Sequence, residues 1–252
     1  MLPWLLILAV APAVFWMWWF YRKDRFDPEP RGLIVKIFLL GMLPVLPAGI
    51  VEIVLFNVFP FVSGTGLVAI ALANLFIVGP VEEVGKYLVV RRWALRHPAF
   101  NEPLDGIVYA AAAALGFAAL ENFFYLIDNG AWLILIRGPL STLNHVLFAA
   151  IWGYAVGMAS VQTDPGEASR LVRNGLIMGS LGHGVSNTLL LAQQSDSVLV
   201  WSPLMAILFA GFLYREVSKN IATSLASSPF QLTSAPSTLH GPNSTEPERR
   251  NQ

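Results

Sequence analysis

Long apolar runs separated by short polar or basic segments fill the first 220 positions of the chain. Seven of these runs are long enough to cross a hydrocarbon core of ~30 Å as α-helices, which takes about 20 residues each. The predicted spans lie near Leu2–Phe20, Leu33–Phe56, Leu67–Val90, Leu104–Ile127, Leu140–Ser160, Leu171–Leu191 and Val198–Tyr214. The pattern therefore predicts an all-α, polytopic membrane helix bundle, with one transmembrane domain over residues 1–220.

Lysine and arginine residues alternate between the two sides of the predicted bundle. One side receives basic clusters at positions 22–31, 91–96, 170–173 and 215–219, whereas the other side has only Arg137. The positive-inside rule then places the N-terminus outside and the C-terminus in the cytoplasm. The first apolar run precedes its basic cluster, which favours an uncleaved span over a signal peptide. Residues 221–252 are rich in Ser, Thr and Pro and predict a disordered cytoplasmic tail.

The composition supports a membrane location and excludes several classes of function. Hydrophobic residues make up 55% of the chain and charged residues only 13%, against roughly a quarter charged in a soluble domain. A formal net charge of zero argues against nucleic-acid binding. The chain has no cysteine, so disulfides, Cys-ligated zinc and thiol catalysis are excluded. Any nucleophile is therefore an oxygen group or water.

The third predicted span carries Glu82, Glu83 and Lys86 inside an apolar run. A charge near the bilayer centre costs at least ~2.5–3.5 kcal/mol, so these side chains are expected to face a protein interior or a wet cavity. Pro80 after Gly79 predicts a break that would place both glutamates in a new first helical turn, near the positive end of its dipole. Lys86 is expected to pair with one of the two glutamates, and the sequence does not choose between them.

Polar side chains recur in the next three predicted spans. These are Glu121 and Asn122, then Asn144 and His145, then His183 and Asn187. A single intramembrane histidine is often only a hydrogen-bond partner between helices, and Glu52 in the second span also has a structural interpretation. Together these groups are too many for packing alone, so we expect one site shared by four helices. Glycines four residues apart, at 153 and 157 and at 175 and 179, favour the close packing that brings the groups together.

Carboxylates, imidazoles and an amide, without cysteine, fit the activation of water for hydrolysis of a peptide bond in the membrane. A glutamate acts as a general base, a histidine orients water or binds a metal, and an asparagine or histidine stabilises an oxyanion. The zinc-protease signature H-E-x-x-H is absent. Neither an Asp pair of the intramembrane aspartyl type nor a Ser–His pair of the rhomboid type is evident. The residues alone leave open which glutamate is the base and whether a metal takes part.

Four motifs occur in order on successive predicted spans. They read E-E-x-x-K at 82–86, F-x-x-x-E-N at 117–122, H-x-x-F at 145–148 and H-x-x-x-N at 183–187. Their order and spacing resemble the PrsW family of bacterial intramembrane proteases, which is related to the prenyl-protein (CAAX) and bacteriocin-processing membrane proteases. The resemblance covers about residues 20–191 and includes the loop at 23–30 and the segment at 102–106.

The resemblance implies an intramembrane endopeptidase of the cell membrane, classed as a metalloprotease, that cleaves a membrane protein such as an anti-sigma factor. Residues carried over by motif are Glu82, Glu83 and Asn187 for catalysis, Glu121, His145 and His183 as metal ligands, and Lys86 and Asn122 in support. Glu82 or Glu83 would be the base or a further ligand, and Asn187 the oxyanion donor. Such a set satisfies zinc. It serves equally well for a metal-free mechanism with glutamate-activated water, as argued for the prenyl-protease relatives.

Two other function classes compete with a protease. A non-catalytic scaffold or chaperone would keep the same bundle for partner binding, and an ion-coupled transporter would use the Glu and His residues as a relay. The intact set of four motifs argues against a scaffold, which need not keep every polar group. The lack of an internal repeat argues against a transporter.

Overall fold

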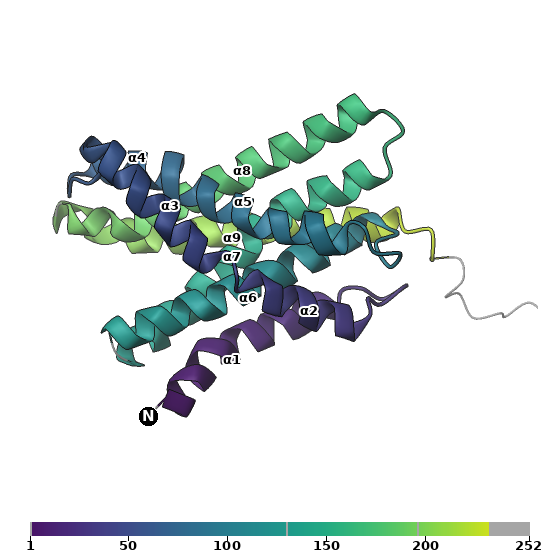
Figure 1. Cartoon of the computed structure of the whole chain (residues 1–252), viewed down its shortest axis with the longest axis horizontal. Coiled ribbons are helices and arrows are strands. Elements are labelled where there is room, and N and C mark those ends of the chain that lie inside the picture. Colours follow the sequence, from purple (N-terminus) through teal and green to yellow (C-terminus); the bar gives the residue numbers. More distant parts are fainter. Residues whose placement is uncertain (1, 130, 196, 232–252) are drawn as a thin grey trace, which may run out of the picture.

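A computed structural model describes residues 2–129, 131–195 and 197–231, and every regular element in these ranges is helical (Figure 1). The long helices are α1 (Leu2–Tyr21), α6 (Pro103–Asn129), α7 (Ala131–Ser160), α8 (Pro165–Leu191) and α9 (Ser202–Ala226). The expected all-α bundle is thus confirmed. Short 3-10 turns at Pro60–Val62, Ala192–Gln194 and Ser197–Trp201 lie between the longer helices.

Five helices are long and apolar enough to cross a membrane within the described ranges. They are Arg31–Val58, Leu67–Ala94, Pro103–Asp128, Gly138–Ser160 and Leu199–Ala226. The apolar part of α1, Leu6–Tyr21, is shorter. Helix α8 has sufficient length but is more polar, because it carries charged residues near its start and His183 and Asn187 further along. Five of the seven predicted spans therefore meet this criterion.

The second predicted span consists of α2 (Arg31–Gly41) and α3 (Val45–Val58), which meet around Pro44. Proline lacks a backbone N–H and disfavours helical geometry in the residue before it, so the chain turns here. Pro44 directly precedes α3, and Pro47 lies in the first turn of that helix. As a result α3 crosses in front of the bundle and packs against α5 (Figure 1).

The third predicted span is one continuous helical stretch with two widened turns. Helix α4 (Leu67–Ala73) leads through a π-helical turn at Asn74–Val78 into α5 (Gly79–Val89), and a second π-turn follows at Val90–Ala94. Gly79 has helical dihedral angles, φ −54° and ψ −55°, and its N–H bonds to Asn74 O. The predicted break before Pro80 is therefore wrong, because the wide turn absorbs the proline without interrupting the helix. The helix-dipole argument for Glu82 and Glu83 does not apply.

Helix α6 forms the centre of the bundle. Its residues from Leu104 to Ala119 are buried, including an unbroken run of alanines from Ala110 to Ala114. Helices α1, α2 and α7 pack against it, and α7 in turn packs against α8. These small side chains allow close helix approach, as the glycine and alanine spacings predict. The neighbouring helices therefore pack around α6.

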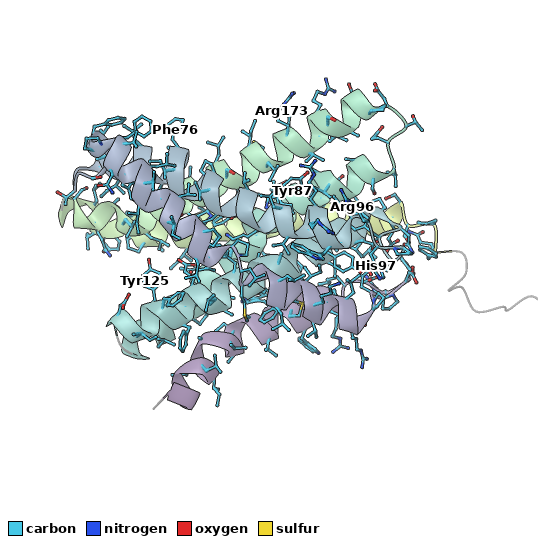
Figure 2. The ribbon with its side chains drawn as sticks, in the orientation of Figure 1. Phe76, Tyr87, Arg96, His97, Tyr125 and Arg173 are labelled. Atoms are coloured by element: carbon cyan, nitrogen blue, oxygen red, sulfur yellow. The ribbon has the colours of Figure 1, made fainter. Side chains whose placement is uncertain are left out.

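The last long helix, α9, extends to Ala226, with Ile221 and Ser224 buried. Residues 221–226, which the composition assigned to the tail, are therefore helical. Residues 232–252 of the expected tail lie outside the described residues. At one end of the bundle Figure 2 shows Arg96 and His97, and Tyr125 lies toward the opposite end.

Candidate active site

Five ionisable side chains from α5, α7 and α8 meet inside the bundle. Glu82, Glu83 and Lys86 lie within two turns of α5, and His145 and His183 reach them from α7 and α8. All five are buried. The convergence expected from the cost of separated intramembrane charges is therefore observed.

Lys86 is the centre of this cluster. Its Nζ lies 3.2 Å from Glu82 Oε2, 2.8 Å from Glu83 Oε1 and 2.9 Å from His145 Nδ1. It also lies 4.3 Å from the centre of the Phe117 ring. The ammonium group thus contacts both glutamates, where the sequence predicted a pair with one of them. A lysine ammonium has three donors and no acceptor, so His145 Nδ1 accepts a hydrogen bond from it.

The tautomer of His145 follows from that contact. With Nδ1 accepting, the ring proton of a neutral imidazole resides on Nε2. His145 Nε2 lies 2.8 Å from Glu121 Oε2, so this ring nitrogen faces the carboxylate. The Glu121 side chain is 20% exposed, more than any other member of the group. His145 therefore bridges the buried ammonium of α5 and the partly exposed carboxylate of α6.

Glu83 connects α5 to α7 and α8 through hydrogen bonds and has no exposed surface. Its Oε1 accepts from Lys86 and lies 2.8 Å from His183 Nδ1, while its Oε2 accepts from Trp152 Nε1 at 2.9 Å. A carboxylate that is hydrogen-bonded to one ring nitrogen of an imidazole fixes the orientation of the ring and its tautomer. His183 consequently presents Nε2 to the rest of the cluster.

Glu82 is the more accessible of the two glutamates. Its side chain is 8% exposed, against 0% for Glu83. Its Oε2 lies 3.8 Å from His145 Nδ1 and 3.8 Å from His183 Nε2, too far for a direct hydrogen bond. One ligand atom from each of Glu82, His145 and His183 lies within 4.8 Å of the other two. This trio is a group that could hold a metal ion.

Aromatic rings hold both imidazoles in place. The ring of Phe148 stacks on that of His183, with centroids 4.9 Å apart, and Phe117 lies 5.8 Å from His145. The two imidazoles meet edge to face at 5.2 Å. Phe117 and Phe148 are the aromatic positions of two of the four motifs, and this contact gives them a physical role.

Two glycines bring α8 close enough to the third span for the His183–Glu83 contact. A Cβ atom on Gly79 would lie 2.5 Å from Ser180 O, and one on Gly184 would lie 2.7 Å from Leu75 Cα. No side chain fits at either position without moving a backbone. Gly184 directly follows His183, so the close backbone approach at Gly184 and the His183–Glu83 hydrogen bond belong to the same contact between α8 and the third span.

The remaining predicted residues lie at different distances from the centre. Asn122 Nδ2 donates to Thr142 Oγ1 at 2.9 Å, which joins α6 to α7 beside Glu121. Asn187 is half-buried one turn beyond His183, and among the hydrogen bonds of the described residues none joins it to the cluster. Sequence reasoning missed Trp152, although it lies seven residues after His145 and thus on the same helical face.

Known proteins match this chain over most of its length. A sequence model of the family described as PrsW family intramembrane metalloprotease matches residues 29–212, which include all four motifs. The chain is 32% identical to Protease PrsW of Geobacillus kaustophilus over 226 residues, 89% of this chain and 96% of that protein. It is 32% identical to Protease PrsW of Bacillus subtilis over 201 residues, 80% and 88% of the two chains.

A third relative, Protease PrsW of Clostridioides difficile, is 28% identical over 217 residues, 84% of this chain and 87% of that protein. No solved structure matches the present one. Matches of this extent cover most of the chain and not only the motif positions. The resemblance predicted from the four motifs is confirmed, and the chain belongs to the PrsW family of intramembrane proteases.

Proposed function

We propose that this protease hydrolyses a peptide bond of a membrane protein with a water molecule activated by Glu82. The observation that carries the proposal is the position of Glu82 Oε2, 3.8 Å from both His145 Nδ1 and His183 Nε2. This spacing leaves the carboxylate and His183 Nε2 near enough to contact the same water. Glu82 also has the exposed surface through which water reaches it.

Glu82 takes a proton from the water as its oxygen attacks the scissile carbonyl carbon. It then returns that proton to the amine nitrogen when the peptide C–N bond breaks. Glu83 does not act as the base, because Lys86, His183 and Trp152 already occupy its oxygens. Its role is to position His183 and Lys86. For the oxyanion we propose Asn187, which lies on the same face of α8 one turn beyond His183.

The donor set of the site fits a zinc ion. Glu82, His145 and His183 would supply one oxygen and two nitrogen ligands, the number typical of catalytic zinc sites, and their ligand atoms lie within 4.8 Å. Glu121, predicted as a ligand, instead contacts the opposite nitrogen of the His145 ring. Zinc bound here would lower the pKa of its water and polarise the carbonyl.

The mechanism with Glu82 as the base is the metal-free one, because Glu82 does not serve as the base while it is a zinc ligand, and one contact favours it over the zinc site. Lys86 Nζ lies 2.9 Å from His145 Nδ1 and 3.2 Å from Glu82 Oε2, so it occupies two of the three atoms that a zinc ion requires. A metal-bound state needs the ammonium to leave His145. Without a metal, the same ammonium stays in contact with both carboxylates.

For the substrate we propose a membrane protein cleaved within or at the edge of the bilayer, an anti-sigma factor being the class implied by the family resemblance. We also propose a cell-membrane location with seven spans, the N-terminus outside and the C-terminus in the cytoplasm. Alternation of basic clusters along the sequence supports this orientation. The packing of α8 against α7 and α5 supports its inclusion among the spans.

The proposal is tested by co-expressing the protease with a tagged anti-sigma factor of the same organism and following cleavage on immunoblots. Glu82→Gln is expected to abolish cleavage with membrane expression intact. Glu167→Gln is the matched control, because Glu167 is an exposed glutamate on α8 that pairs only with Arg170 in the described structure. Undiminished cleavage by Glu82→Gln contradicts the assigned base. Substrate binding without cleavage by the wild type indicates the scaffold class, and proton flux in liposomes indicates the transporter class.

A further inference from the structure

A second group of buried carboxylates lies where the loop between α1 and α2 meets the start of α6. Asp24 and Glu29 belong to this loop, and Asp105 lies in the first turn of α6. One carboxylate oxygen from each lies within 4.8 Å of the other two. Their exposed fractions are 4%, 2% and 0%. The proposed hydrolysis uses none of these residues.

Backbone groups and a tyrosine hold the three side chains in place. Asp24 Oδ2 accepts from Glu29 N at 3.0 Å, and Tyr109 Oη donates to Glu29 Oε2. Asp105 Oδ2 accepts from the backbone N–H groups of Asn101 and Glu102, at 2.6 and 2.8 Å. The other oxygens of the two aspartates, Asp24 Oδ1 and Asp105 Oδ1, are buried without a hydrogen-bond partner. Two buried carboxylate oxygens therefore lack a hydrogen-bond donor, while hydrogen bonds hold the other oxygens in place.

No basic side chain neutralises this group within the described residues. Two basic residues of the same loop turn elsewhere, since Arg22 lies over the ring of Trp18 at 5.0 Å and Lys23 over that of Trp19 at 4.2 Å. Burial raises the pKa of Asp24 to about 7 and that of Glu29 to about 9. Buried carboxylates without a counter-charge are costly, and a partial charge at a helix N-terminus does not offset three of them.

We propose that Asp24, Glu29 and Asp105 bind a divalent cation of the calcium or magnesium type, which ties the α1–α2 loop to the start of α6. An all-oxygen donor set selects such hard cations, whereas two of the three donors at the candidate active site are imidazole nitrogens. Oxygens up to 4.8 Å apart can surround one calcium ion, whose ligands lie at about 2.3–2.6 Å. Asp24 Oδ1 and Asp105 Oδ1, which have no hydrogen-bond partner, become ligands. The hydrogen bonds to the other carboxylate oxygens stay unchanged.

The test is calorimetric titration of the purified full-length protein in detergent, stripped with EDTA and desalted, with calcium chloride and separately with magnesium chloride. We expect one saturable site per chain with at least one of the two ions, and a rise in the unfolding midpoint when that ion is present. The double variant D24N/D105N is expected to bind at least tenfold more weakly and to lose the rise. The side-chain carbonyl of an asparagine at position 24 or 105 still accepts the hydrogen bonds from the backbone N–H groups of Glu29, Asn101 and Glu102. The variant therefore removes charge and keeps these hydrogen bonds.

Two further variants locate the ion. Glu216→Gln changes an exposed glutamate of α9 and is expected to bind as the wild type does. E82Q/H183A disables the candidate active site and is also expected to keep the binding. The proposal is overturned by the absence of saturable binding of both ions to the wild type, by equal affinity in D24N/D105N, or by loss of binding in E82Q/H183A. If the double variant does not fold, Glu29→Gln replaces it, and unchanged affinity in that variant overturns the proposal as well.

Discussion

Trp152 donates its indole N–H to Glu83 Oε2 at 2.9 Å, and this hydrogen bond connects α7 to the part of α5 that carries the charged cluster. Trp152 has no exposed surface, and its ring also meets Tyr87 edge to face at 5.8 Å. Glu83 in turn orients His183. The indole therefore supports the geometry of the site without facing the substrate.

Replacing Trp152 by Phe is expected to destabilise the protein and to slow cleavage. Phenylalanine keeps an aromatic ring but leaves a buried carboxylate oxygen without its donor, which costs about 1–3 kcal/mol. Because Glu83 positions His183, we expect kcat to fall while KM changes little. Thermal unfolding and cleavage kinetics measure both effects. Trp201→Phe, at an exposed tryptophan, is the control, and equal behaviour of the two variants would contradict the supporting role.

Replacing Lys86 by Met is expected to be the most destabilising change in the cluster. It leaves Glu82 and Glu83 side by side without a counter-charge and removes the donor to His145 Nδ1. Breaking a buried ion pair by removing one partner costs about 3–5 kcal/mol. The double variant K86M/E83Q removes the unpaired charge at Glu83, so we expect it to recover part of the unfolding midpoint. A double variant no more stable than Lys86→Met would show that the pairing is energetically unimportant.

Metal removal separates the two mechanisms. If Glu82, His145 and His183 hold zinc, the purified protein carries about one zinc per chain, and a chelator stops cleavage until zinc is restored. His183→Ala is then expected to lose the bound zinc while staying folded, which elemental analysis detects without an activity assay. Full cleavage in the presence of the chelator, with no zinc in the protein, establishes the metal-free mechanism instead.

Asn187→Ala tests the proposed oxyanion donor. Loss of one such donor typically lowers kcat by about 10²–10³-fold. Asn187 is half-buried and makes no hydrogen bond to the cluster in the described structure, so the unfolding midpoint is expected to stay close to that of the wild type. Thr188→Ala, at the next position, removes a hydroxyl that donates to Gly184 O and serves as the control. Unchanged kcat in Asn187→Ala would remove this residue from the mechanism.

The sequence predicted which side chains meet, because intramembrane charges need partners and the motif residues share helix faces. It did not predict how they meet. Whether Lys86 pairs with one glutamate or both depends on the rotation of α5, which the π-turn at Asn74–Val78 sets and which no residue spacing reveals. The sequence also does not show which nitrogen of His145 faces Glu82 and which faces Glu121, because the orientation of the ring decides this.

Gly184→Ala is expected to separate α8 from the third span and to disrupt the site from a position that carries no chemistry. The added Cβ would lie 2.7 Å from both Asn74 O and Leu75 Cα, and these are backbone atoms that cannot turn aside. Helix α8 must therefore shift, which lengthens the His183–Glu83 bond, and misplacement of about 1 Å can cost 10²-fold in rate. We expect a lower unfolding midpoint together with a large loss of kcat. Gly211→Ala on α9 is the matched control, because its Cβ meets nothing within 4 Å and alanine favours a helix by about 1 kcal/mol. If both variants cleave like the wild type, contact between α5 and α8 does not control the reaction.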